Sequence, residues 1–337
     1  MNIILVYLGK KVPKYVFLNL NLIRTQFPHN QTVLVTDNEN AAKKAQKYGA
    51  LSFLVPPPKE VWGLKPSHLS HDINFRQSFW YNSLARFYAL LLYATEFPKN
   101  QFLHVEADVL LLPNFPIKLL SKISTSLAFP LSTIENAAAS TVFIKNFESI
   151  KNLVDFAELT AKSVPFSTDM SILALYASKF PERVMLLPTA PNNRNSFTKS
   201  TNQNSFSKFT SNSDYFKGIF DANTWGQFLT GEDERNFYGI RRIYHHIPHH
   251  SIEPRKFAIE FNQSVQVKIE NLTIDLFSLH IHSKEKALFD RRRSQKQLRR
   301  LISKSESGTV HQIKLLVLIK LLPNTLKKLF LRIIGND

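Results

Sequence analysis

The segment QTVLVTDNENAAKKAQKYGALSFLV, residues 31–55, decides the fold class of this protein. It begins with an apolar, β-branched run that ends in Asp37-Asn38, continues through a stretch rich in Ala, Lys and Gln up to Gly49, and closes with a second apolar run. Short apolar runs bounded by turn residues are typical of buried strands. The middle stretch has the composition of a helix that ends at a glycine. The segment therefore predicts a strand, a helix and a second strand.

The chain before this segment follows the same pattern. NIILVYLG (2–9) predicts a strand, and KYVFLNLNLIRTQF (14–27) predicts the helix that connects it to the strand at 31–38. The resulting β-α-β-α-β order indicates a parallel sheet with its ligand at the carboxyl ends of the strands. Gly9 and Asp37 are therefore expected at the ligand-binding edge.

Later segments extend this α/β body. SFWYNSLARFYALLLYATEF (78–97) has helical spacing, and SLAFP (126–130), STVFIKN (140–146) and RVMLLP (183–188) are strand candidates. Thr189–Ser213 is rich in Asn, Ser, Thr and Phe without periodicity, which predicts a long irregular loop. The pattern predicts one α/β body over residues 1–283, without a second core.

Charge divides the chain into a body and a tail. Residues 284–337 hold 14 Lys and Arg against 4 Asp and Glu, which is +10 of the net charge of +17. The chain has no cysteine, which excludes disulfides and thiolate metal sites. The basic run RRRSQKQLRR leaves a nucleic-acid-binding protein as an alternative class, although the charge is confined to the tail. MNIILVYLG is too short in its apolar part for a signal peptide, so we expect a cytoplasmic location.

FLHVEADVLLLPN, residues 102–114, places Glu106 and Asp108 directly after an expected strand. Strand alternation would point both side chains the same way at the ligand-binding edge. Two carboxylates on one side suit Mg²⁺ or Mn²⁺. A solvated turn is the alternative for an isolated pair of acids.

Six segments occur in the order expected for one enzyme class. In chain order they are LVTDN, FWYNSLARFYALLLYATEF, HVEADVLLLPNF, STDMSILALY, GIFDANTWGQFLTGEDERN and LFSLHIHSK. Over about residues 1–284 the chain resembles bacterial nucleotide-sugar-dependent glycosyltransferases with a GT-A-like fold. The resemblance implies a Rossmann-type mixed sheet flanked by helices. Glu-Ala-Asp at 106–108 matches the DxD motif of that family, with Glu in its first position.

The resemblance implies a metal and donor site. Glu106 and Asp108 would hold Mn²⁺ or Mg²⁺ on a nucleotide-sugar donor, for which a UDP-sugar is favoured. By analogy with families in which a late histidine completes the metal site, His282 is expected as a third ligand and Lys284 as a diphosphate contact. His280 is instead expected to be a core residue.

Further site residues are expected around this centre. Gly9, Asp37 and Arg86 are candidates for nucleotide or diphosphate contact, with a solvated surface charge as the alternative for Arg86. Asp233 is the first candidate for the base or acceptor contact, and Asp169 and Glu232 are further candidates. Asp169 also lies where it would cap a helix.

The function that the resemblance implies is sugar transfer to a glycan or lipid-linked acceptor, in the biosynthesis of cell-surface polysaccharide or lipopolysaccharide. A relative that binds sugar nucleotides without turnover is an alternative. The tail, 284–337, is expected to be basic, helical and amphipathic. TLKKLFLRII (325–334) predicts peripheral attachment to an anionic membrane surface, at the inner face of the cytoplasmic membrane. A helix packed back on the body is the alternative.

Overall fold

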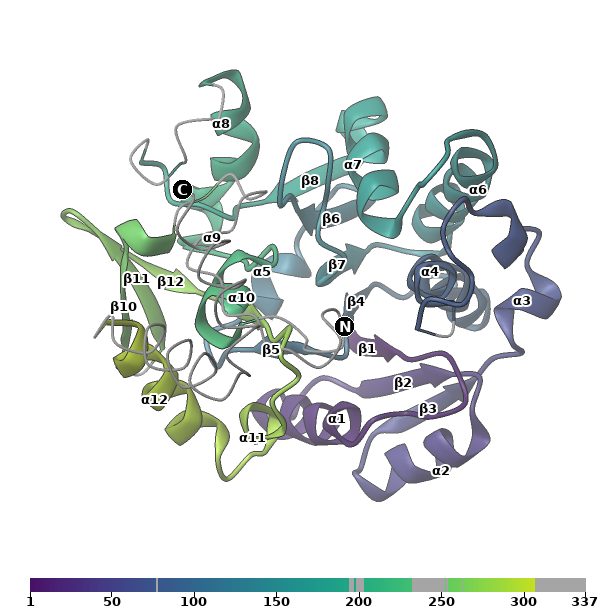
Figure 1. Cartoon of the computed structure of the whole chain (residues 1–337), viewed down its shortest axis with the longest axis horizontal. Coiled ribbons are helices and arrows are strands. Elements are labelled where there is room, and N and C mark those ends of the chain that lie inside the picture. The colour runs from purple at the N-terminus through teal and green to yellow at the C-terminus, as the bar shows by residue number, and fades with distance from the viewer. Residues whose placement is uncertain are drawn as a thin grey trace, which may run out of the picture.

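A seven-stranded sheet runs through the centre of the molecule (Figure 1). The computed structural model of the chain describes residues 1–76, 78–193, 197, 203–231, 252, 254–262 and 264–306. The strand order is β3-β2-β1-β4-β7-β6-β8. The strands are β1 (Asn2–Val6), β2 (Thr32–Thr36), β3 (Leu51–Leu54), β4 (Phe102–Val105), β6 (Leu127–Pro130), β7 (Thr141–Ile144) and β8 (Val184–Leu187).

The sheet is mixed. β1 pairs in parallel with β2 and β4, and β2 pairs in parallel with β3. β7 is antiparallel to both β4 and β6, and β8 is parallel to β6. The expected α/β class with a mixed sheet is confirmed, and the six strands predicted from apolar runs outside the acidic segment are all present.

Helices cover both faces of this sheet. Every residue of β2, β4, β6 and β7 is therefore buried, whichever face its side chain points to. The chain moves outward from β1 to β3 and then returns to β4, so right-handed connections place α1 and α2 on one face and α4 on the other. α6 and α7 pack against α4. The helices of these layers are α1 (Lys14–Gln26), α2 (Glu39–Lys47), α3 (Pro58–Val61), η1 (Pro66–His68), α4 (Phe79–Glu96), α5 (Ile117–Leu120), α6 (Phe147–Ser163), α7 (Asp169–Lys179) and η2 (Pro181–Arg183).

The strand order reverses between β1 and β4. An open α/β sheet forms its ligand crevice outside the carboxyl ends of the strands at such a reversal. The turn that carries Glu106 and Asp108 follows β4 directly, so the fold places both acids at the carboxyl edge beside this reversal.

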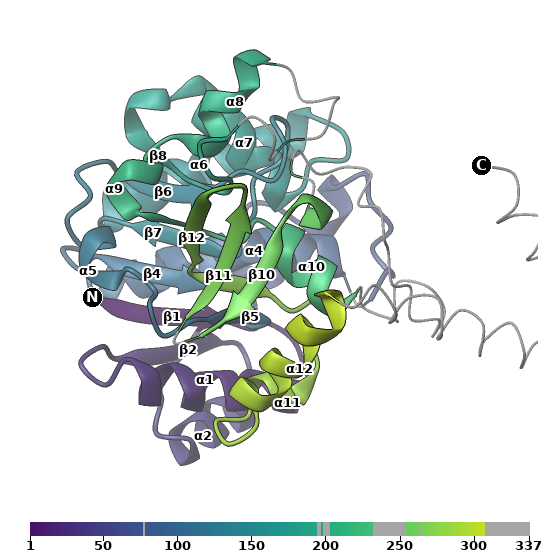
Figure 2. The same cartoon turned by 90° about the vertical axis from the view of Figure 1, so that its left-hand side faces the viewer.

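Two small sheets extend the body (Figure 2). One has the order β10-β11-β12-β9, and the other pairs β5 with β13. Their elements are β5 (Val109–Leu111), β9 (Gly218–Ile219), α10 (Thr224–Thr230), η5 (Pro254–Lys256), β10 (Ala258–Phe261), β11 (Val265–Ile269), β12 (Leu272–Leu276) and β13 (Ser278–His280). Their buried residues are continuous with the main hydrophobic core, as expected for a single core.

The stretch Thr189–Ser213 is more ordered than its composition predicted. It contains α8 (Gln203–Thr210), and α9 (Ser213–Phe216) follows it. The fully buried Phe209 lies in α8, and its carbonyl accepts the N–H of Thr189 at 2.8 Å. The prediction of a wholly irregular loop is therefore wrong, because tertiary burial of a phenylalanine stabilises a helix that the local sequence does not specify.

The first part of the expected tail packs on the body. α11 (Lys286–Phe289) contacts α1, and α12 (Ser294–Glu306) contacts β10 and α10. Leu288, Phe289, Leu298 and Ile302 are buried, and the Phe289 ring lies 5.7 Å from that of Tyr15. The segment predicted to bind membranes, 325–334, lies outside the described residues. Within the described part of the chain, every helix is too short or too polar to cross a bilayer.

Candidate functional site

Glu106 and Asp108 lie in a tight turn at the carboxyl end of β4. The N–H of Glu106 donates to the carbonyl of Ser140, and the N–H of Val109 donates to the carbonyl of Glu106, each at 3.0 Å. The chain thus reverses into β5 instead of continuing as a strand. The expected strand alternation is therefore not what aligns the two acids. The turn itself brings both carboxylates to one imidazole.

That imidazole belongs to His280. β13 pairs with β5 so that His280 lies opposite Val109. The Nε2 atom of His280 lies 3.4 Å from Asp108 Oδ1 and 3.6 Å from Glu106 Oε2. One ligand atom from each of the three residues lies within 4.8 Å of the others.

The placement of the two histidines differs from the sequence expectation. His280 is buried, as expected of a core residue, yet its ring faces the carboxylates. His282 stacks on His280, with ring centroids 4.2 Å apart and planes inclined by 24°. The cluster of three converging ligand atoms contains His280 and not His282, so His282 as a metal ligand stays a prediction.

Asp221 fixes the backbone of His280. Its Oδ2 accepts the N–H of His280 at 2.8 Å and the N–H of Gly226 at 2.7 Å. Its Oδ1 accepts the N–H of Trp225 at 2.9 Å. Burial raises the pKa of Asp221, and these donors oppose that rise. One buried carboxylate therefore joins the first turn of α10 to the end of β13.

Gly226 and Asn223 complete the support of His280. A Cβ atom on Gly226 would lie 2.0 Å from the backbone oxygen of His280, so only glycine allows α10 to pack this closely. The Oδ1 of Asn223 hydrogen-bonds the Nδ1 of His280. With Nδ1 donating to this amide, Nε2 is left to face the two carboxylates.

Arg86 connects Glu106 to Asp169. Its guanidinium forms an ion pair with Glu106 and another with Asp169, the latter at 2.8 Å. Its Nε donates to the carbonyl of Ser83 at 2.6 Å, within the same helix. The side chain is 13% exposed, so the surface alternative for Arg86 does not hold.

Asp169 is the first residue of α7, and Thr168 is its N-cap. The Oγ1 of Thr168 accepts the N–H of Ser171 at 3.2 Å, and the Oγ of Ser171 accepts the N–H of Thr168 at 2.9 Å. The capping role considered for Asp169 therefore belongs to its neighbour. The carboxylate of Asp169 faces Arg86, and its role as a base stays a prediction.

Lys284 returns to the site after β13. Its Nζ lies 3.4 Å from Asp108 Oδ2, and its N–H donates to the carbonyl of Ile281 at 2.9 Å. Its φ of 52° is in the left-handed region, which reverses the chain. Asp108 is thus flanked by His280 on one oxygen and Lys284 on the other.

The charges around the two acids lower their pKa values. Burial by itself raises the pKa of Glu106. The positive charge of Arg86, and next that of His280, together lower this pKa by more than burial raises it, so the net shift is downward. Burial likewise raises the pKa of Asp108, and His280 and Lys284 hold it well below its usual range. Both carboxylates are therefore ionised at neutral pH.

His280 and Asp169 shift in the opposite sense. Burial lowers the pKa of His280, but Asp108 and Glu106 together raise it to about 9. Burial raises the pKa of Asp169, and Arg86 offsets part of that rise. In the metal-free protein, a protonated imidazole therefore lies between the two ionised carboxylates.

Gly9 and Asp37 meet at the other half of the same edge. The Oδ1 of Asp37 accepts the N–H of Gly9 at 2.7 Å, where Gly9 has a φ of 115°. The amide of Asn38 donates to the carbonyl of Lys10 at 2.7 Å, and its oxygen caps α2 by accepting the N–H of Ala41 at 3.0 Å. The ends of β1 and β2 are thus joined. Contact of Gly9 or Asp37 with a nucleotide stays a prediction.

The remaining predicted residues, Glu232 and Asp233, lie outside the described residues. Sequence reasoning assigned no role to Asn19, Asn223 or Asp221. The Nδ2 of the buried Asn19 donates to the carbonyls of Ala107 and Val109, at 3.0 and 2.8 Å, and so supports the acidic turn from α1. The sequence signal that could have identified Asn19 is a polar residue among the leucines of LNLNL, residues 18–22.

The donor set fits a divalent cation. Two carboxylate oxygens and one imidazole nitrogen suit Mn²⁺, and the oxygens also suit Mg²⁺. Buried charges are costly unless they are paired, and Glu106 and Asp108 are balanced here by Arg86, Lys284 and His280. A cation at the convergence of the ligand atoms would take the place of the proton on His280.

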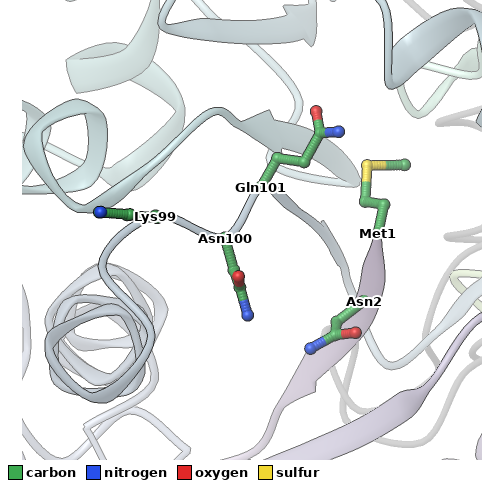
Figure 3. Close-up of a pocket in the computed structure, with 5 residues that line it drawn as sticks. All are labelled: Met1, Asn2, Lys99, Asn100 and Gln101. Carbon is green, nitrogen blue, oxygen red and sulfur yellow. The ribbon is translucent and has the colours of Figure 1, made fainter.

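A separate cavity of about 340 Å³ opens at the amino end of the sheet (Figure 3). Met1, Asn2, Lys99, Asn100 and Gln101 line it. These residues precede β1 and β4 or begin them, so the cavity lies at the edge opposite to the acidic turn. It has one charged side chain and no carboxylate, and it plays no part in the site described above.

Comparison with known proteins finds no matching family model and no similar sequence among curated proteins. Similar solved structures include the galactosyltransferase LgtC in complex with donor and acceptor sugar analogues, at 14% identity over 62% of this chain and 84% of that chain, with a TM-score of 0.43. A glycosyltransferase involved in the glycosylation of the major capsid of PBCV-1 matches at 12% identity over 55% and 81%, with a TM-score of 0.35. The PaToxG glycosyltransferase matches at 12% identity over 53% and 69%, with a TM-score of 0.32. At these sequence identities and TM-scores, the likeness to the solved structures assigns no activity to this chain. The function proposed below is argued from the side chains of the site.

Proposed function

We propose that this protein is a metal-dependent glycosyltransferase that takes its sugar from a nucleotide-sugar donor. The observation that carries the proposal is the convergence of Glu106, Asp108 and His280 within 4.8 Å. The convergence lies beside the reversal of strand order, where open α/β sheets bind ligands. The site thus combines a cation-binding donor set with the position in the fold where a nucleotide is expected.

The charges of the site match the demands of sugar transfer. Breaking the bond between a sugar and a nucleoside diphosphate develops negative charge on the leaving group. A bound Mn²⁺ or Mg²⁺ would neutralise part of that charge as a Lewis acid. Lys284, beside Asp108, would contact the diphosphate directly. Arg86 would hold Glu106 in its ionised form and in a fixed orientation.

The rest of the donor and the acceptor would lie on either side of this centre. On the β1–β2 side, Gly9 and Asp37 would meet the nucleoside, and a UDP-sugar is the favoured donor. On the α7 side, Asp169 is a candidate for the contact with the attacking hydroxyl. Glu232 and Asp233 remain candidates for the same role. We assign His280, rather than His282, as the third metal ligand.

The acceptor would be a glycan or a lipid-linked carrier of cell-surface polysaccharide or lipopolysaccharide. Reversible attachment to the inner face of the cytoplasmic membrane would bring the enzyme to such an acceptor. Basic residues near an anionic surface contribute about 1 kcal/mol each, and 325–334 holds three of them. Flotation of the full chain with anionic vesicles tests this part, and failure to bind at low salt contradicts it.

A donor screen tests the main proposal. The purified full chain is incubated with UDP-, GDP- and CMP-sugars and Mn²⁺, and release of free sugar is measured. We expect slow hydrolysis of one donor that stops when the metal is chelated. Binding of a donor without any release of sugar or transfer would instead identify a sugar-nucleotide-binding protein. Absence of both binding and hydrolysis with every donor would contradict the proposal.

A further inference from the structure

A cluster of aromatic side chains lies at the start of α4, the helix that carries Arg86. We define the aromatic rim as His71, Phe75, Phe79, Trp80 and Phe166. The ring of Trp80 stacks against those of His71 and Phe75, at 4.9 and 6.0 Å. Phe166 meets the His71 ring edge to face at 5.6 Å. The side chains come from the start of α4, from the segment before it and from the loop that precedes α7.

Phe166 is the exposed member of the aromatic rim. It is 65% exposed, and its φ of 57° is in the left-handed region, which is unfavourable for a side chain with a Cβ atom. Arg76 and Ser78 also have positive φ values, at 46° and 64°. Strained backbone at an exposed aromatic residue is typical of functional sites, since stability alone would select against both features.

The aromatic rim is continuous with the candidate site. The carbonyl of Ser167 hydrogen-bonds Nε2 of His71 at 3.2 Å, which fastens the loop of Phe166 to the rim. Asp169 follows two residues later and pairs with Arg86, which pairs with Glu106. Phe166 therefore lies three residues before Asp169, and the ion pairs of Arg86 connect Asp169 to Glu106 in the acidic turn.

We propose that the aromatic rim, with Phe166 as its exposed face, binds a pyranose ring of the acceptor glycan. The proposal rests on the proposed function. The C–H face of a pyranose is apolar and its edge carries hydroxyls, so it matches an aromatic ring surrounded by polar groups. The exposed Asp72 and Asn74, from the same segment as His71 and Phe75, supply such groups. A sugar bound here would lie against the loop that leads into Asp169, the first residue of α7.

Two other occupants fit less well. A nucleoside base is expected on the β1–β2 half of the edge, at Gly9 and Asp37, whereas the aromatic rim belongs to the α4–α7 half. An anionic membrane surface requires a set of basic side chains. The exposed neighbours include Asp72, and the guanidinium of Arg76 lies over the Phe79 ring at 4.8 Å. An uncharged sugar is the occupant that this chemistry favours.

Saturation-transfer NMR on the full chain tests the proposal. The probes are the methyl glycosides of β-glucose, β-galactose, β-N-acetylglucosamine and α-mannose at millimolar concentration, without metal or donor. We expect at least one glycoside to receive saturation from the wild-type protein. F166A should reduce the transfer about fivefold or more, as for an interface residue that contributes strongly to binding. F166Y, which keeps the ring, should restore it.

F97A is the matched control. Phe97 is also an exposed phenylalanine, 41% exposed, but it lies at the other end of α4, so its removal should leave the transfer unchanged. The proposal is overturned if none of the four glycosides receives saturation from the wild-type protein, or if F166A transfers as much saturation as the wild type. Loss of UMP binding or of anionic-vesicle binding in F166A, with glycoside binding retained, also overturns it. Mn²⁺ binding and donor hydrolysis by the wild-type protein report on the proposed function separately from the glycoside measurement.

Discussion

The carboxyl edge of the large sheet has two halves that are built differently. On the β1–β2 half, Asp37 and Asn38 hold Gly9 and Lys10 through hydrogen bonds that connect residues 28 or 29 positions apart. On the β4 half, Glu106 and Asp108 meet His280, a residue distant in the sequence that the pairing of β13 with β5 brings to the turn. The first half joins two neighbouring strand ends and supports a loop. The second half gathers charged side chains from α4, the acidic turn and the end of β13.

This difference predicts how each half responds to substitution. On the β1–β2 half, removal of the Asp37 side chain loses its hydrogen bond to the N–H of Gly9. A half that gathers charge from distant segments loses both its ligand chemistry and the balance among its remaining charges. Variants of the β4 half should therefore have larger effects than variants of the β1–β2 half.

The largest effect is expected for D108N. The substitution removes the carboxylate that faces both His280 and Lys284. We expect metal-supported donor hydrolysis to fall about 10³-fold, or about 4 kcal/mol, with the fold retained. Hydrolysis across a Mn²⁺ titration, beside thermal melting, measures both. A folded D108N protein with wild-type metal-dependent turnover would refute the role of Asp108.

G226A should give the next largest effect. Its Cβ would meet the backbone of His280 at 2.0 Å, and neither backbone segment can move without breaking the hydrogen bonds to Asp221. We expect a loss of about 3 kcal/mol in the free energy of unfolding, measured by urea denaturation.

G63A is the control for this variant. A Cβ on Gly63 would meet the carboxylate of Glu158, which is the flexible end of a side chain and can move away. G63A should lower the free energy of unfolding by less than about 1 kcal/mol. Equal costs for the two variants would show that contact between α10 and β13 is not what requires glycine at position 226.

N223G tests how His280 is oriented. Glycine accepts the φ of 77° at this position but removes the oxygen that bonds Nδ1 of His280. We expect the affinity for Mn²⁺ to fall about 10- to 100-fold, as for other residues that orient a metal ligand. Electron paramagnetic resonance of free Mn²⁺ measures the affinity. N223D keeps an acceptor oxygen and should retain most of it, and equal affinities in N223G and the wild type would remove the role of Asn223.

The pH dependence of metal binding should follow His280. Its pKa of about 9 in the metal-free protein lies above the unfolded value of about 6.5. The proton therefore stabilises the metal-free fold fully below about pH 6.5, and this contribution is lost as pH rises through about 9. Because Mn²⁺ must displace that proton, its affinity should rise about tenfold per pH unit between about pH 7 and 9.

Calorimetry in two buffers of different ionisation enthalpy measures the proton released on Mn²⁺ binding. H280Q has no proton to release in this range and should lose the pH dependence. A pH-independent affinity in the wild-type protein would show that His280 is not protonated before metal binds.

The smallest effect is expected on the β1–β2 half. D37A removes the acceptor for the N–H of Gly9 and should lower the free energy of unfolding by about 1 kcal/mol, measured by urea denaturation. D37N keeps an acceptor oxygen and should lower the free energy of unfolding by less than D37A does. If D37A abolished donor hydrolysis as completely as D108N does, the two halves would be equally important, and the comparison drawn above would fail.

Sequence periodicity predicted the local elements of the fold well. The apolar runs at 2–9, 31–38 and 51–55 became β1, β2 and β3, and the Ala-rich stretch between the last two became α2. These elements are short-range, because each is specified by apolar spacing and by the turn residues that bound it. Helix α8 was missed because its stability depends on burying Phe209 in a core formed by distant segments.

The candidate site was predicted in part. Glu106, Asp108, Arg86, Asp169 and Lys284 were all chosen from sequence. The structure pairs Arg86 with Glu106 and Asp169, and Lys284 with Asp108, and His280 connects the two groups. His280 was not chosen as a metal ligand. His280 and His282 are separated only by Ile281, and residue types alone do not show which of the two faces the acids. The register between β13 and β5 distinguishes them, and that register is a property of the folded sheet.

The sequence by itself determined the order of strands and helices up to β3, the position of two acids after a strand, and the concentration of basic residues beyond residue 283. The tertiary structure decided which groups meet those acids. Hydrogen bonds from Asp221 and Asn223 orient His280, and the close packing of Gly226 fixes its distance from the turn. Such contacts depend on side-chain geometry across segments that are far apart in the chain, whereas secondary structure depends on neighbours within a few residues.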